Sequence, residues 1–304
     1  MTIPLLRTAD EIAKSLRLPL YDEACAFRQR RHAYNVLQST APTLDAGGLP
    51  VVLVGGLLST PWLFEPMRQW FDLAHCGPTI APVGLGIDCG ERTTAHLLQF
   101  LEKVARENDR PAMIVAHSRG GQFARAAAVR RPDLVRALIT MGSPLNRLIG
   151  GLHPILKAEA AAIGMAGTLG APRLMRYACL NGQCCRELRK DLTRPFPQSV
   201  PFLSIFSYSD TVVDWRSSLD PFARHRHIPT THLGLLYSFD AVADELGRIL
   251  YADRVAARTT PVRRSRNTRR VTTPSLRHRI QQAQNESPTE PKGRLPLDPN
   301  PWRK

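Results

Sequence analysis

The sequence predicts an α/β protein built on a doubly wound, mostly parallel sheet, with a helical cap-like insertion and a disordered basic C-terminal tail. From Pro50 onward, short apolar and β-branched runs alternate with longer amphipathic stretches. A segment rich in small and apolar residues, 143–200, interrupts this alternation, and apolar residues become rare after residue 252. Short apolar runs separated by helices of ten or more residues are typical of βαβ units, whose strands are buried on both faces.

The individual elements follow from residue periodicity. Residues 1–45 are expected to form a helical lead-in, because Leu5, Ile12 and Leu16 recur at roughly helical spacing. The α/β domain then occupies residues 46–252. Its expected strands are 51–54, 79–83, 112–115, 135–141, 200–206 and 224–230. Its expected helices are 62–72, 93–108, 121–131 and 239–250.

The insertion has two possible interpretations. Residues 143–200 are rich in Ala, Gly, Leu and Met and end near a charged, helix-like stretch at 186–191. One interpretation is a cap or lid over the functional site. The other is a long helical crossover between two strands. The sequence does not favour either one.

The positive charge belongs to the tail. The chain has a net charge of +15, and residues 254–304 alone carry 13 Lys and Arg against 3 Asp and Glu. The remaining +5 on the first 253 residues is unremarkable for a globular domain, so no specific nucleic-acid partner is expected. The tail cannot bury enough apolar surface to fold, so it is predicted to be disordered. A solvated tail is favoured over weak contact with anionic surfaces.

Membrane-spanning and secreted classes are disfavoured. No run approaches the ~18 apolar residues that a membrane-spanning helix needs. Residues 1–20 contain Arg7, Lys14 and Arg17 rather than an uninterrupted apolar stretch. They therefore do not resemble a cleaved secretory signal, and a cytoplasmic protein is expected.

The cysteines give metal binding little support. They are Cys25, Cys76, Cys89, Cys179, Cys184 and Cys185. None of them forms the C-x-x-C spacing typical of zinc sites, so no metal is expected. Cys76 could pair with Cys89, and Cys179 with Cys184 or Cys185, but reduced thiols are favoured in a protein without a secretory signal.

Ser118 is the candidate nucleophile. It stands in Ala116-His117-Ser118-Arg119-Gly120, directly after an apolar strand and directly before a helix. A serine at such a sharp turn lifts its Oγ above the sheet edge, and the residues two before and two after it must be small. The N–H of Arg119, at the helix N-terminus, is then expected to donate to a developing oxyanion. The alternative is that Ser118 is simply an N-cap.

A second oxyanion donor is expected after the first strand of the α/β domain. Gly55 and Gly56 end this strand and would allow the backbone to approach a substrate closely. The N–H of Leu57 is the first candidate, and that of Leu58 is the fallback. An ordinary Gly-Gly turn is the alternative.

Asp210 and His232 are the candidate acid and base. Asp210 follows the strand at 200–206, which places its carboxylate at the same sheet edge as Ser118. Asp214 and Asp220 are competitors for this role, and a turn-forming role for Asp210 is also possible. His232 follows the last strand, ahead of the final helix, and a loop there can return its imidazole to the serine.

Of the other histidines, His225 and His227 alternate within the expected last strand, and His278 lies in the tail. His117, beside the serine, is expected to face away from the site and to be structural.

These segments resemble the α/β-hydrolases, and within them actinobacterial lipase- or esterase-like enzymes. The resemblance spans about residues 50–250 and is carried by Val51–Leu58, Ala116–Pro144, Ser207–Trp215 and Thr231–Gly234. It implies hydrolysis of a carboxylic ester through an acyl-enzyme, without a cofactor. Two departures stand out: Ala116 replaces the first glycine of the serine motif, and Gly55-Gly56 replaces the His-Gly common at the oxyanion loop.

The expected partner is therefore a small-molecule ester or lipid substrate. Two alternatives use the same residues differently. An acyltransferase would use the same triad and pass the acyl group to an acceptor other than water. A non-catalytic binding protein would keep the fold without the reaction.

Overall fold

A computed structural model describes residues 20–37, 44–146 and 151–259. The chain divides into one unit that ends at Arg258 and a second unit, 259–304, which lies almost entirely outside the described residues. The tail predicted to be disordered begins at residue 253, but residues 253–259 are described and helical; the rest of the predicted tail lies outside the described residues. So do the prediction for the first part of the helical lead-in and the position of His278.

The core is a six-stranded sheet in the order β2-β1-β3-β4-β5-β6. Its strands are β1 (Pro50–Val54), β2 (Gly77–Ile80), β3 (Ala112–His117), β4 (Val135–Met141), β5 (Phe202–Phe206) and β6 (Arg224–His227). Each neighbouring pair runs parallel, as the apolar runs predicted. The order reverses direction between β1 and β3, and ligands in open α/β sheets bind beyond the carboxyl ends of the strands at such a point.

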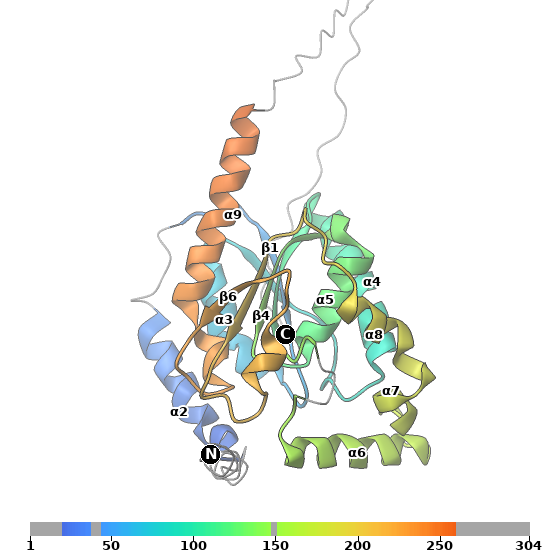
Figure 1. The fold of residues 1–304 in the computed structure, drawn as a ribbon. Helices are drawn as coiled ribbons and strands as arrows, with labels where there is room; N and C mark the ends of the chain where they lie inside the picture. The colour runs from blue at the N-terminus through green and yellow to red at the C-terminus, as the bar shows by residue number, and fades with distance from the viewer. Residues whose placement is uncertain (1–19, 38–43, 147–150, 260–304) are drawn as a thin grey trace, which may run out of the picture. The chain divides into compact units, whose positions relative to one another are not determined.

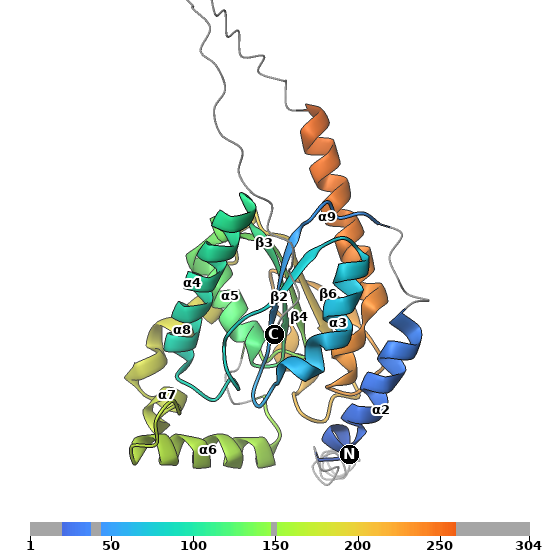
Figure 2. The ribbon, with the colours of Figure 1, turned by 180° about the vertical axis from the view of Figure 1, so that it is seen from behind.

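Helices cover both faces of the sheet (Figures 1 and 2). One face carries α2 (Leu20–Leu37), α3 (Pro61–Leu73) and α9 (Phe239–Thr259). The other carries α4 (Gly90–Asn108), α5 (Gly120–Arg130) and α8 (Arg186–Thr193). Along β1, Val51 and Leu53 pack into the first layer, whereas Val52 and Val54 pack into the second. This alternation is the strand period of two, and it explains why β1 is apolar throughout.

The described part of the interruption, 143–146 and 151–200, is largely helical. It contains α6 (Pro154–Thr168), α7 (Tyr177–Asn181), a 3₁₀ turn (Gln183–Cys185) and α8. In both ribbon views α6 lies across one end of the layered core, and α8 lies beside α4 and α5 (Figures 1 and 2). The segment therefore joins β4 to β5 and also places helices outside the sheet layers.

Prolines explain two of the differences in strand length. The second strand was expected at 79–83, but β2 ends at Ile80, because Pro82 has no N–H to continue the ladder. The last strand was expected to reach residue 230, but β6 ends at His227, shortly before Pro229. In contrast, α9 continues to Thr259, past the expected domain end at 252.

Candidate active site

Ser118 occupies a strained turn between β3 and α5. Its φ is +54°, in the left-handed region that non-glycine residues rarely adopt. Its N–H donates to the carbonyl of Met141 at 2.9 Å, which fixes the turn to β4. A Cβ on Gly120 would lie 2.5 Å from the carbonyl oxygen of Val54 and 2.6 Å from that of Gly55. Gly120 must therefore be small because the end of β1 crosses next to it.

The N-cap of α5 is Arg119 rather than Ser118, and no side chain caps this end of the helix. The alternative that Ser118 is a capping residue therefore has no support. The Arg119 side chain instead reaches back to the loop before α4 and donates to the carbonyls of Gly86 and Asp88. Sequence reasoning assigned a role only to the backbone of Arg119 and missed this contact.

Asp210 and His232 are in direct contact. His232 Nδ1 lies 2.7 Å from Asp210 Oδ2, and both side chains are buried. The other carboxylate oxygen, Oδ1, accepts the N–H groups of Val212 at 2.9 Å and Val213 at 2.8 Å. One Asp210 oxygen thus orders its own loop while the second holds the imidazole. Nε2 is left as the ring nitrogen that can serve Ser118.

The competing carboxylates have other partners. Asp214 begins a 3₁₀ turn and accepts the N–H of Arg216 at 3.1 Å. Asp220 is buried and forms an ion pair with the guanidinium of Arg125 on α5. Among the histidines, His225 and His227 are exposed on the edge strand β6. The structure therefore brings together the pair that the sequence analysis favoured.

Two backbone N–H groups are available near Ser118. Among the described residues, neither the N–H of Leu57 nor that of Arg119 donates a hydrogen bond. The N–H of Leu58, the fallback donor, is already bound to the carbonyl of Leu85 at 2.7 Å. A Cβ on Gly56 would lie 2.7 Å from Ser118 Cβ and 2.9 Å from the Arg119 nitrogen. Only glycine at residue 56 lets the Leu57 loop approach the serine this closely.

The candidate catalytic residues lie at one pocket of about 350 Å³. Ser118, His232 and Leu57 line it together with residues of the insertion. The insertion contributes mostly apolar side chains, among them Leu152, Leu156, Ala160, Met175, Leu180 and Leu188. The insertion therefore supplies much of the pocket wall. This holds whether the insertion is regarded as a cap or as a long helical crossover.

Comparison with solved structures identifies the fold. The mature lipase BlEst2 of Bacillus licheniformis superposes with a TM-score of 0.50 at 16% identity, covering 67% of this chain and 94% of that one. The chain has the α/β-hydrolase fold. The propeptide form of the same lipase superposes with a TM-score of 0.50 at 16% identity, covering 67% of this chain and 51% of that one. Neither likeness supports the narrower resemblance to actinobacterial enzymes.

A monoacylglycerol lipase of Paleococcus ferrophilus superposes with a TM-score of 0.49 at 14% identity, covering 68% of this chain and 96% of that one. No family model and no curated protein sequence matches the chain. At these identities the comparisons show the α/β-hydrolase fold alone. Among the described helices, none combines the length and apolarity needed to cross a bilayer.

His117 does not face away from the site, contrary to the sequence-based expectation. Its ring centroid lies 4.6 Å from that of His232, and its Nε2 lies 3.0 Å from the His232 carbonyl oxygen. Burial, and secondarily the nearby His232, lowers the pKa of His117 to about 3. The ring is therefore neutral at pH 7. Because a carbonyl can only accept, Nε2 must carry the proton and donate it to His232.

This neutral histidine predicts a pH-dependent loss of stability. As the pH falls below about 6.5, the unfolded chain protonates residue 117 while the folded chain does not, so the free energy of unfolding falls. The loss continues toward pH 3 at up to about 1.4 kcal/mol per pH unit. In His117→Phe, unfolding between pH 6.5 and pH 4 should take up about one proton fewer than in the native chain. The free energy of unfolding should therefore fall less steeply with decreasing pH.

Urea unfolding at a series of pH values measures this difference. The matched control is His225→Phe, which replaces an exposed histidine on β6 and should keep the slope of the native chain. If His117→Phe and the native chain showed the same slope of unfolding free energy against pH, His117 of the native chain would be protonated in the folded state as readily as in the unfolded state.

The cysteines do not form the first suggested pair. Cys76 packs in the layer with α3, whereas Cys89, Cys179 and Cys185 lie in the opposite layer. All of these, together with Cys184, are free thiols in the structure. Cys25 lies outside the side chains that the structure describes.

Proposed function

We propose that this protein is a serine hydrolase that cleaves a carboxylic ester, with Ser118 as nucleophile, His232 as base and Asp210 orienting the base. One observation carries the proposal. The buried contact of 2.7 Å between His232 and Asp210 opens onto the same pocket as a serine held at φ +54°. A buried carboxylate behind the imidazole and a strained serine in front of it are the parts that nucleophilic acyl transfer requires.

The reaction follows from these groups. Ser118 Oγ attacks the acyl carbon while His232 Nε2 takes its proton, and the carbonyl oxygen becomes an oxyanion. The N–H groups of Leu57 and Arg119 then donate to this oxyanion. His232 gives the proton to the leaving alcohol, and the acyl group remains on Ser118. Water, activated by His232, then attacks the acyl-enzyme and releases the acid.

The pocket favours an apolar acyl group. Most of the side chains that the insertion contributes are aliphatic, and their burial against an acyl chain would supply binding energy. We therefore expect esters of apolar acids to be better substrates than esters of charged ones. A series of p-nitrophenyl esters of graded chain length measures this preference.

Labelling by a fluorophosphonate probe tests the proposal. The native chain should react, whereas Ser118→Ala should not react, because it has no hydroxyl to phosphonylate. In His232→Ala, labelling should be at least about 10³-fold slower, because the serine loses its base. His225→Ala, which changes an exposed histidine, is the matched control and should label like the native chain. A folded native chain that fails to label would contradict the proposal.

A further inference from the structure

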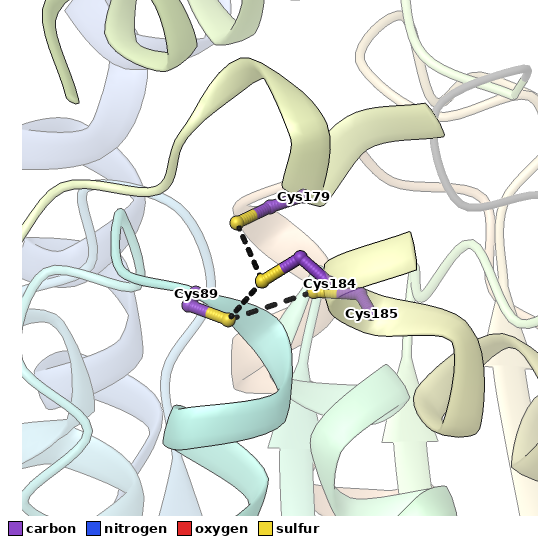
Figure 3. Close-up of side chains that lie close together, drawn as sticks. All are labelled: Cys89, Cys179, Cys184 and Cys185. Atoms are coloured by element: carbon purple, nitrogen blue, oxygen red, sulfur yellow. Dashed lines mark hydrogen bonds between the residues drawn. The ribbon is translucent and has the colours of Figure 1, made fainter. Parts of the chain in front are cut away.

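Four cysteines meet at the pocket wall (Figure 3). Cys89 immediately precedes α4, Cys179 lies in α7, and Cys184 and Cys185 lie in the turn that leads into α8. Their Sγ atoms all lie within 4.8 Å of one another. Three of these side chains are buried, and that of Cys184 is exposed. Segments far apart in the sequence thus converge on one group of sulfurs.

The spacing of the sulfurs is that of a tetrahedral metal site. Sγ of Cys184 lies 3.4 Å from that of Cys89 and 3.4 Å from that of Cys179, and Sγ of Cys185 lies 3.6 Å from that of Cys89. With Zn–S bonds of about 2.3 Å, a tetrahedron of thiolates has its sulfurs about 3.8 Å apart. A cluster of several iron atoms would need more space between its ligands. A disulfide would join only two of the four sulfurs.

Cys179 and Cys89 lie next to groups that carry partial positive charge. The N–H of Arg176 donates to Cys179 Sγ at 3.3 Å, and Cys89 stands directly before the first residue of α4. The positive end of the α4 dipole adds to this effect. These donors would stabilise negative charge on the sulfurs in the way that ligand-orienting hydrogen bonds do at metal sites.

Arg119 brings a positive charge to the cluster. Arg119 lines the same pocket as Cys179 and Cys185, and its guanidinium donates to the carbonyl of Asp88, the residue before Cys89. A divalent ion with four thiolates carries a net charge of −2. Arg119 would offset part of this charge.

We propose that Cys89, Cys179, Cys184 and Cys185 bind one Zn²⁺ as four thiolates. Each thiol gives its proton to solvent as the metal binds. Soft sulfur ligands in a tetrahedron select zinc over magnesium or calcium, and four protein ligands leave no open position for catalysis. The ion is therefore structural. The exposed Cys184 gives it access from solvent.

The site would fasten the insertion to the α/β core. It joins α7 and the start of α8 to the first residue of α4, and Cys179 and Cys185 also line the substrate pocket. Without the metal, this part of the pocket wall is held by noncovalent contacts, among them the hydrogen bond of 3.0 Å from the Leu188 N–H to the Glu91 carboxylate and the ion pair of 2.6 Å between Arg130 and Asp191. Zinc binding should therefore order the wall against which the substrate packs.

Metal analysis of the full-length chain tests the proposal. The chain is purified under reducing conditions without chelator, and its metals are measured by inductively coupled plasma mass spectrometry. We expect about one zinc per chain. Cys89→Ser and Cys185→Ser should reduce this content at least about tenfold, because each removes one of the four thiolates. Cys76→Ser, whose thiol lies in the opposite layer, and Ser118→Ala should keep it.

Two measurements on the native chain keep the test independent of variant folding. Replacement of zinc by Co²⁺ should produce the intense sulfur-to-cobalt absorption of a tetrahedral thiolate site. Removal of the metal should lower the Tm by at least about 5 °C, and added Zn²⁺ should restore it.

Three results would overturn the proposal. One is a folded, reduced chain that neither carries zinc nor binds it on titration. The second is a mass that shows the four cysteines oxidised to disulfides. The third is stoichiometric iron, or zinc that persists in Cys89→Ser. Because Ser118→Ala is expected to keep the metal, failure of the hydrolase proposal and failure of the zinc proposal give different results.

Discussion

Asp210→Asn is expected to lower kcat for ester hydrolysis by about 10⁴-fold while leaving the fold intact. The carboxylate oxygen that faces His232 Nδ1 at 2.7 Å can accept a hydrogen bond from Nδ1–H, which keeps the ring proton on Nδ1 and leaves Nε2 free to act as the base. In the variant, the amide NH₂ would occupy that position and donate to Nδ1. The imidazole would then carry its proton on Nε2, where it could no longer accept the proton of Ser118.

The structure explains why this variant should remain folded. The second oxygen of Asp210 accepts the N–H groups of Val212 and Val213. An asparagine retains one carbonyl oxygen, which can keep both of these hydrogen bonds while its amide nitrogen faces His232. The loss of activity would then report the tautomer of the base rather than a displaced loop.

Steady-state kinetics with a p-nitrophenyl ester measure the effect on kcat and KM separately. The matched control is Asp214→Asn in the same loop, whose carboxylate contacts only the turn around Arg216. This variant should keep kcat within about threefold of the native value, because the Asp214 carboxylate binds the Arg216 N–H and guanidinium, whereas it is Asp210 that contacts His232. Equal losses in the two variants would remove Asp210 from the proposed role.

The fold could be predicted because burial on both sheet faces leaves a direct trace in the sequence. β1, β3 and β5 are entirely buried; β1 is a continuous apolar run, and the other two are apolar except for His117 and Ser204. The exact ends were less predictable, because they depend on the hydrogen bonds of neighbouring strands. Ala81 still donates to Leu53 at 2.8 Å, but Pro82 cannot extend the pairing.

The candidate acid and base could be placed because they follow strands whose carboxyl ends share one sheet edge. Rejecting the competitor Asp220 required the structure. Its partner, Arg125, lies on α5 and is distant in sequence. Similarly, β3 reads as an apolar strand with one histidine, and nothing local shows that His117 packs against His232.

The cysteine cluster could not be predicted from the spacing of cysteines in the sequence. A zinc ribbon or finger places ligands in pairs separated by two to four residues, because one turn supplies both. Here Cys184 and Cys185 are adjacent, and Cys89 comes from the start of a different helix. Only the packing of α8 against α4 and α5 brings these segments together.

Arg125→Met is expected to reduce the free energy of unfolding by about 3–5 kcal/mol. The Arg125 side chain is 1% exposed and that of Asp220 is 3% exposed. The guanidinium also donates to the carbonyls of Asp191 and Arg194, at the end of the insertion. Removing the arginine leaves the Asp220 carboxylate buried without its countercharge, which is the costly half of a broken ion pair.

Urea unfolding of two further variants separates this explanation from a simple loss of packing. Arg125→Met combined with Asp220→Leu should recover most of the lost stability, because no uncompensated charge remains in the core. Arg216→Met, which breaks an ion pair of 3.5 Å on the surface, should leave the free energy of unfolding nearly unchanged. A double variant as unstable as the single one would show that the methionine fits poorly rather than that the charge is stranded.

The ion pair of Arg125 and Asp220 also bears on the part of the chain that lines the pocket. Arg125 lies on α5, the helix that follows Ser118. Of its two carbonyl partners, Asp191 lies in α8 and Arg194 directly follows α8. Arg125 thus ties the helix after Ser118 to the insertion, and it is not among the residues that line the pocket. At temperatures well below the Tm, each folded molecule of Arg125→Met should therefore label with fluorophosphonate as fast as the native chain. Slower labelling would mean that the pair also positions the serine turn.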